Sequence, residues 1–128
     1  MLEDGIYNEI KNDPTLAGKL LSAGIYNIYP LRVPDNTQVT KAVTYTEVTQ
    51  NLVYPLARTS LIQLNCIAPT FEEARDLAND IDRIFNDKAE YFLGGTFPVK
   101  YTAFKGRNSF YDTNAQMFIF AVEVSIKY

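Results

Sequence analysis

The spacing of hydrophobic positions changes along the chain and indicates helices in some segments and strands in others. The clearest pattern runs from Thr70 to Asn86, where apolar residues recur every three or four positions, the period of one helical face. These positions are Ala74, Leu77, Ala78, Ile81, Ile84 and Phe85. Residues 70–73 form a capping box, in which the Thr70 hydroxyl accepts from the Glu73 amide. The sequence therefore predicts a capped amphipathic helix that lies on a sheet.

The first twenty or so residues predict a short N-terminal helical segment with a break in it. Leu2, Ile6 and Ile10 lie at helical spacing ahead of Asp13-Pro14. Proline lacks a backbone donor and disfavours helical geometry in the residue before it, so a first helix should end there. Asp13 can cap a second helix with proline at its first position, which stops before Gly24.

Strand-like patterns occupy most of the remaining chain. Runs of β-branched, aromatic or alternating residues predict strands at 25–29, 43–48, 60–68, 97–104 and 118–127. The 60–68 run is apolar on both faces, which favours a central strand covered on both sides. Turns are expected at Gly94-Gly95 and, as a hairpin with Gly106 at positive φ, at Lys105–Asn108. Prolines mark loops at Pro30–Thr40 and around Pro55.

These elements predict an α+β fold, a mostly antiparallel β-sheet with one long amphipathic helix packed on it and a short N-terminal helical segment. The chain has 128 residues, 47% of them hydrophobic, and a net charge of −3. A chain of this size and composition can bury a single core, and its low net charge excludes the composition typical of intrinsically disordered chains. We expect one domain over residues 1–128.

The net charge and the length of the apolar runs also limit which partners the protein can bind. A slightly acidic chain is a poor ligand for phosphate, so no sequence-specific nucleic-acid binding is expected. No stretch reaches the roughly 18–20 apolar residues that cross a bilayer, and the acidic start differs from a signal peptide, so neither secretion nor membrane insertion is predicted. Cys66 stands alone in an apolar run, which is consistent with a buried thiol and synthesis in a reducing cytoplasm.

The residue inventory gives little support to catalysis. The chain has no histidine and one cysteine, which excludes Ser-His and Cys-His pairs and nitrogen-ligated zinc sites. Glu72, Asp76 and Asp80 follow one another at four-residue spacing on the predicted helix, and such acids can hold a divalent cation or serve acid–base chemistry. A solvated helix face explains them better, since they lie away from the apolar stripe and first-turn acids favour the positive end of the helix dipole. We expect no enzyme activity, no cofactor and no metal.

The charges are nevertheless unevenly distributed. Residues 70–87 contain six acidic and two basic residues, whereas residues 97–108 contain Lys100, Lys105 and Arg107 and no acid. Opposite charges on different parts of one small domain favour head-to-tail contact between copies. Glu72, Asp76, Asp80, Lys100, Lys105 and Arg107 are therefore the candidate subunit-interface residues.

The order of elements resembles the tail-completion, or tail-terminator, proteins of long-tailed bacteriophages. The resemblance is carried by an N-terminal helix, Gly24-Ile25-Tyr26, a proline-marked loop, Val43-Thr44-Tyr45, and the strand 61–66 that runs into Ala68–Ala78 with its Glu-Ala-Arg character. It covers most of the chain, and its individual motifs are generic.

The resemblance implies a structural virion protein that forms a ring, commonly a hexamer, at the head-proximal end of the tail tube. Such a ring ends tail growth and joins tail to head, with the major tail tube protein and a head–tail connector protein as partners. DNA can pass through its channel, and the Pro30–Thr40 loop and the Lys100–Asn108 hairpin are expected to make contacts above and below it. The expected location is the tail or neck of a virion assembled in the bacterial cytoplasm. A head–tail connector or stopper protein, a small ligand-binding domain and a carboxylate-based metal enzyme remain alternatives.

Overall fold

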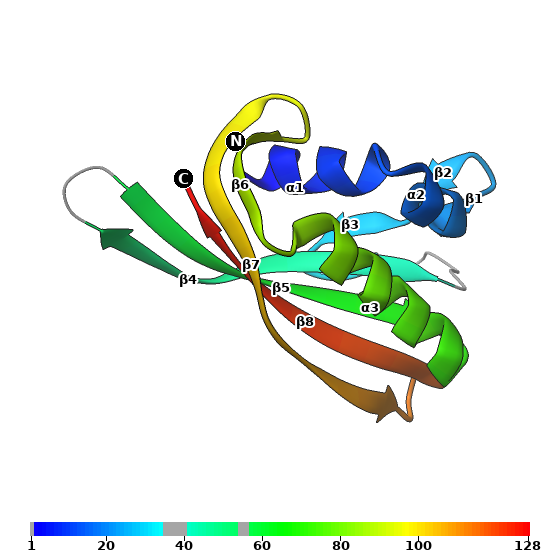
Figure 1. Ribbon diagram of the computed structural model, residues 1–128. Helices are drawn as coiled ribbons and strands as arrows, with labels where there is room; N and C mark the ends of the chain where they lie inside the picture. The colour runs from blue at the N-terminus through cyan, green and yellow to red at the C-terminus, as the bar shows by residue number, and fades with distance from the viewer. Residues whose placement is uncertain (1, 35–40, 54–56) are drawn as a thin grey trace.

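The computed structural model describes residues 2–34, 41–53 and 57–128, and for residues 49–53 and 57 it describes the backbone only. Three helices, α1 (Leu2–Lys11), α2 (Pro14–Leu20) and α3 (Phe71–Phe85), lie on one face of a six-stranded sheet (Figure 1). A two-stranded hairpin, β1 (Leu21–Ser22) and β2 (Ile25–Tyr26), follows α2. The fold thus has a helical layer on one side of a single main sheet.

The main sheet has the strand order β3-β4-β5-β8-β7-β6. Its strands are β3 (Ile28–Pro30), β4 (Ala42–Val53), β5 (Ala57–Ala68), β6 (Lys88–Leu93), β7 (Phe97–Asp112) and β8 (Met117–Lys127). β3 runs parallel to β4, while the other pairs are antiparallel. The sheet is therefore mixed, which corrects the expectation of a mostly antiparallel sheet. The physical reason is that β3 and β4 are joined by a long connection instead of a tight hairpin turn, so β4 can enter in the same direction as β3.

The helices begin where the sequence predicts, although all three are short. The expected long helix, α3, has 15 residues, and its N-cap Thr70 accepts from the Glu73 amide at 3.2 Å. Asp13 caps α2 by accepting from the Leu16 amide at 3.0 Å, with Pro14 at the first helical position. Both predicted caps are confirmed, and the N-terminal helical segment consists of two helices of ten and seven residues.

The core lies between the helices and the inner face of the sheet. Ile62, Leu64 and Cys66 on β5 are buried there beside Val122 and Val124 on β8. β5 is an inner strand of the sheet, as predicted. Its opposite face is only half-buried, because all three helices lie on one side, and the prediction that this strand is covered on both sides is wrong.

The prediction of a hairpin turn at Lys105–Asn108 is also wrong. β7 continues through these residues to Asp112, and a β-bulge between Phe104 and Gly106 takes up the glycine with its φ of +155°. The turn occurs at residues 113–116 instead, where the Asp112 carboxylate accepts from the Asn114 and Ala115 amides. The Lys100–Asn108 segment is thus the middle of a long strand.

Other predicted turns have different outcomes. Gly94 and Gly95 form the turn between β6 and β7 with φ values of +64° and +84°, which confirms that prediction. The Pro30–Thr40 loop lies outside the described residues from residue 35 onward, and the break around Pro55 lies outside them entirely.

Candidate assembly surfaces

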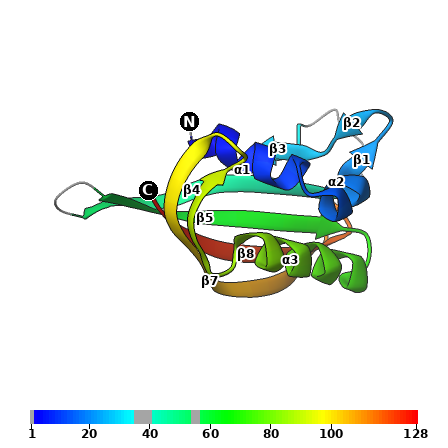
Figure 2. The same ribbon diagram turned by 45° about the horizontal axis from the view of Figure 1, so that its top comes forward.

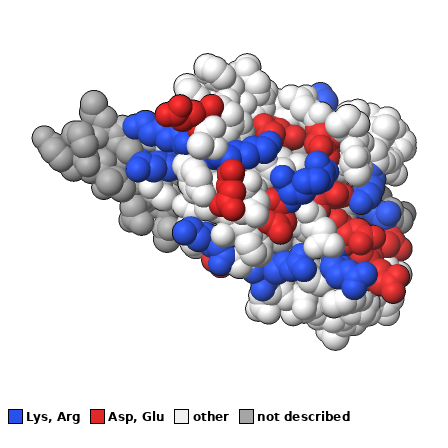
Figure 3. Space-filling view, viewed as in Figure 1, with Lys and Arg blue, Asp and Glu red and all other residues white. Residues whose placement is uncertain are grey.

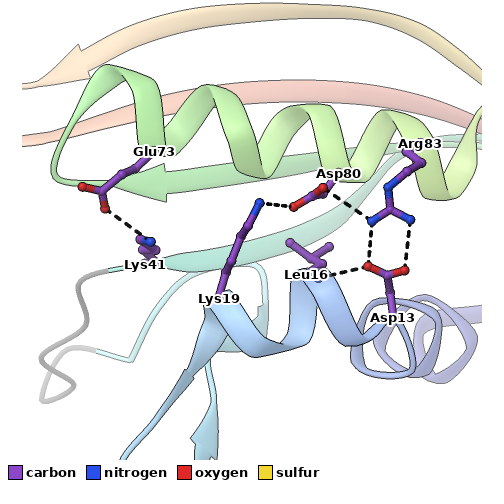
Figure 4. Close-up of polar contacts among 7 residues, drawn as sticks. All are labelled: Asp13, Leu16, Lys19, Lys41, Glu73, Asp80 and Arg83. Carbon is purple, nitrogen blue, oxygen red and sulfur yellow. Dashed lines mark hydrogen bonds and ion pairs between the residues drawn. The ribbon is translucent and has the colours of Figure 1, made fainter.

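The acidic side of α3 divides into an inner part that is bound within the chain and an outer part that is free for other contacts. Asp80 is only 9% exposed. Its carboxylate receives the Lys19 ammonium of α2 at 2.7 Å and the Arg83 guanidinium at 3.4 Å (Figure 4). Glu73, in the first turn of α3, lies 3.5 Å from the ammonium of Lys41, the residue before β4. Asp80 therefore holds α2 against α3, whereas Glu72 and Asp76 are exposed on the outer side.

Arg83 joins this network to the start of α2. Its guanidinium donates to both carboxylate oxygens of Asp13, at 3.0 and 2.7 Å (Figure 4). These hydrogen bonds hold the pKa of Asp13 below its ordinary value and, with Asp80, raise the pKa of Arg83. The cap of α2 and the last turns of α3 are thereby held by one charged cluster.

The three basic candidates on β7 do not form a separate pole. Arg107 reaches back to α3, where its Nη1 donates to Asn79 Oδ1 at 2.7 Å, and its guanidinium lies 5.6 Å from the centre of the Phe120 ring. Lys100 and Lys105 are exposed. On the face shown in Figure 3, basic and acidic side chains are interspersed, so the structure brings Arg107 close to the acidic helix of its own chain.

An aromatic cluster lies beside Arg107 and was missed by the sequence analysis. Phe71 contacts Phe118 and Phe120 with ring centres 6.0 and 5.2 Å apart, and Tyr111 lies 4.8 Å from Phe118. Phe71 is 43% exposed and Tyr111 46%. Exposed aromatic residues next to arginine are typical of the energetic centre of protein interfaces. The alternation of Phe118 and Phe120 was a usable signal, but their meeting with Phe71 depends on tertiary packing.

A second unpredicted feature is a hollow of about 270 Å³ between α1 and the β3–β4 edge. Apolar side chains such as Ile6 and Ile62 line it, and Glu3 and Glu47 add carboxylates. Glu47 accepts from the Ser60 hydroxyl at 2.6 Å. Burial and the nearby carboxylates Asp4 and Glu3 raise the pKa of Tyr45 in its wall. The hollow therefore has an acidic rim, and it lies at the β3–β4 end of the sheet, away from β7.

The described residues contain no cluster of ligands suited to a metal ion. Cys66 is fully buried, and desolvation raises the pKa of its thiol far above the ordinary value. Among the described residues, no helix has the length and apolarity needed to cross a membrane.

Comparison with known proteins gives a likeness of fold. No protein family matches the sequence, and no curated protein does either. The structure is similar to a chain in the virion of a native gene transfer agent particle, with a TM-score of 0.70 and 13% sequence identity. The similarity covers 95% of this chain and 90% of that chain. The two chains therefore share their fold over nearly their whole lengths.

Proposed function

We propose that this chain is a structural protein of a phage-like virion. More specifically, it forms a ring, commonly of six subunits, at the head-proximal end of the tail tube, ends tail growth and joins the tail to the head. The observation that carries the proposal is the shared fold with a virion chain over 95% of this chain, which agrees with the resemblance to tail-terminator proteins. The major tail tube protein and a head–tail connector protein are its proposed partners, and DNA passes through the ring without sequence-specific contacts.

The exposed surfaces support a role in assembly. Phe71, Tyr111 and Arg107 present aromatic and cationic groups on one end of the sheet, and such groups contribute strongly to protein interfaces. The proposal gives the chain no catalytic role, cofactor or metal.

Charge is proposed to set the register of the contact between copies. The exposed Lys100, Lys105 and Arg107 of β7 are the proposed basic partners, and the exposed Glu72 and Asp76 of α3 in the next copy are the proposed acids that receive them. Reversing the three basic residues to Glu should weaken assembly most at low salt, because screening already reduces the attraction at high salt. An oligomer unchanged by this reversal at both salt concentrations would rule out the charge contact.

Tail length tests the proposed role directly. A phage mutant that does not make this protein should produce tail tubes that are longer than normal and carry no heads. The purified protein, added to growing tubes, should stop their extension. Electron microscopy of the tubes, with the chain labelled by an antibody, should place it at one tube end. Label on isolated heads with tubes of normal length would favour the connector or stopper alternative, and normal virions without the chain would overturn both.

A further inference from the structure

Two stretches of strand, at opposite ends of the main sheet, pair with another strand on one side only among the described residues. β6 pairs with β7 only as far as Thr102, whereas β7 continues to Asp112, so residues 103–112 pair with β8 alone. β3 pairs with β4 only over Val43–Tyr45, whereas β4 continues to Val53 and pairs there with β5. We call these stretches the β7 edge (residues 103–112) and the β4 edge (residues 46–53). Unpaired backbone groups on a strand edge can pair with a strand of another chain.

The two edges have similar construction. Each contains one β-bulge near its beginning, between Glu47 and Thr49 on β4 and between Phe104 and Gly106 on β7. Beyond the bulges the strands run on to Val53 and Asp112. Figures 1 and 2 show the β4–β5 hairpin extending beyond the rest of the molecule, while the end of β7 forms the opposite border of the sheet. Both edges are therefore accessible to a neighbouring backbone.

The flanks of the β7 edge are suited to hold an added strand. Tyr111 and Phe118 lie on the helix side of the sheet. Phe110, which is 50% exposed, lines a shallow hollow of about 400 Å³ with Gln63 and Ala121 on the outer side. In strand addition, backbone hydrogen bonds supply affinity and the side chains on the two faces supply specificity. An added strand would thus find aromatic contacts on both of its faces.

Charge indicates which strand is added. Pairing of two β7 edges would bring Lys105 and Arg107 of one copy close to the same residues of the other, and like charges across a strand pair are destabilising. The β4 edge has the sequence Thr-Glu-Val-Thr-Gln-Asn-Leu-Val, with Glu47 as its charged residue and no lysine or arginine. We propose that the β7 edge of one copy pairs with the β4 edge of the next copy, so that the sheets of neighbouring copies join into one continuous sheet.

This inference rests on the proposed ring and specifies its contact. The two edges are different surfaces at opposite ends of one sheet, so the contact is heterologous and repeats from copy to copy until a ring closes. Glu47 of the β4 edge then adds an acid to the surface that approaches Lys105 and Arg107, beside the exposed Glu72 and Asp76 of α3.

Cross-linking between two introduced cysteines tests the contact. The variant with both Thr46→Cys and Asn108→Cys is treated with a short bis-maleimide, in concentrated solution and on tail tubes that have bound the chain. The native Cys66 is buried and should not react. A ladder of cross-linked copies ending at one ring size is expected, and Asn108→Cys alone should remain monomeric. Dimers from Asn108→Cys alone would instead indicate pairing of two β7 edges and overturn the proposal.

Proline substitution gives an independent measurement. Successive residues of a strand direct their N–H groups to opposite sides, so one of Asn108→Pro and Ser109→Pro removes a donor from the open edge and the other removes one from the β8 ladder. The variant that keeps the wild-type melting temperature should lose self-association at least tenfold. Wild-type association in that variant would overturn the edge contact.

The outcomes separate this inference from the proposed function. An oligomer, or a capped tube, that gives no ladder from the double-cysteine variant overturns the edge contact and leaves the proposed role standing. A chain that neither self-associates nor binds tube ends overturns both. A chain that self-associates through the two edges but does not bind tubes overturns only the role at the tail.

Discussion

Gly94 lies directly against Gly5, so that a Cβ built on Gly94 would come within 2.7 Å of the Gly5 carbonyl oxygen. The β6–β7 turn packs on α1 at this point, and the Glu9 carboxylate of α1 accepts from the Gly94 amide at 2.8 Å. The close approach of two backbones requires glycine here, in addition to the φ of +64°. The contact ties the edge strand β6 to the first helix.

Gly94→Ala should therefore cost more stability than Gly95→Ala. Gly95 also has positive φ, at +84°, but a Cβ there meets nothing within 4 Å, so its replacement should cost only about 1–2 kcal/mol of backbone strain. Gly94→Ala should cost about 2–4 kcal/mol, because the clash adds to the strain. Chemical denaturation of both variants measures the difference. Equal losses would show that the contact with Gly5 contributes nothing.

Asp13→Asn should reduce stability near neutral pH and not at low pH. Its hydrogen bonds from Arg83 hold the pKa of Asp13 below its ordinary value of 3.8. A carboxyl whose pKa is lower in the folded state stabilises the fold above the unfolded pKa, and this contribution is lost as the pH falls through the folded pKa. We expect a loss of about 0.5–1.5 kcal/mol at pH 7, and the stabilities of the two proteins should converge as the pH falls through the folded pKa of Asp13.

Asp13→Ala serves as the matched control, because it removes the helix cap as well as the charge. It should cost about 1 kcal/mol more than Asp13→Asn, and that extra loss should persist at low pH, where a protonated Asp13 can still accept from Leu16. Urea denaturation at several pH values measures both effects. A loss from Asp13→Asn that does not change with pH would contradict the role of the charge.

Asp80→Ala should destabilise the fold, whereas Asp76→Ala should not. Asp80 is nearly buried and receives Lys19 at 2.7 Å, so its loss removes the carboxylate that holds the Lys19 ammonium and should cost about 1–3 kcal/mol. Asp76 lies on the exposed side of the same helix, and its loss should change stability by less than about 0.5 kcal/mol. Thermal melts of the two variants make the comparison. If both variants lost only a similar small amount of stability, the ion pair of Asp80 would contribute no more to the fold than a solvent-exposed acid does.

Cys66 should resist labelling until the protein unfolds. The thiol is completely buried and its pKa is raised by desolvation, so neither access nor thiolate is available in the folded state. Incubation with a thiol reagent at pH 8 should give no adduct in mass spectrometry without denaturant and full labelling above the unfolding midpoint. Rapid labelling of the folded protein would mean that β5 opens locally.

The parts of the fold that were predictable from the sequence have local causes. The cap at Thr70 and the apolar stripe of α3 depend on residues within one helix, and Asp13-Pro14 identifies the start of α2 through its own chemistry. The turn at Gly94-Gly95 needs positive φ, which glycine supplies at no steric cost. In each case the signal and the structure lie within a few residues of one another.

The predictions were wrong where the structural role of a residue depends on tertiary contacts that its local sequence does not show. Gly106 favours a turn by composition, yet it sits in a bulge of β7, while the true turn lacks glycine and is stabilised by the Asp112 side chain. Asp80 shares the spacing of Glu72 and Asp76, and only the position of Lys19, 61 residues away, makes it a buried ion-pair partner. The aromatic contact of Phe71 with Phe118 likewise depends on how α3 crosses the sheet. Such relationships are set by tertiary packing and leave no local pattern.

The position of β8 has a consequence for how the protein is made. β8 lies between β5 and β7, so it joins two groups of strands that are synthesised before it and do not pair with each other. A ribosome must release residues 117–127 before β7 and β6 can join the sheet that begins with β3, β4 and β5. Pairings this distant in sequence form slowly. The main sheet is therefore expected to be completed only after residues 117–127 have left the ribosome.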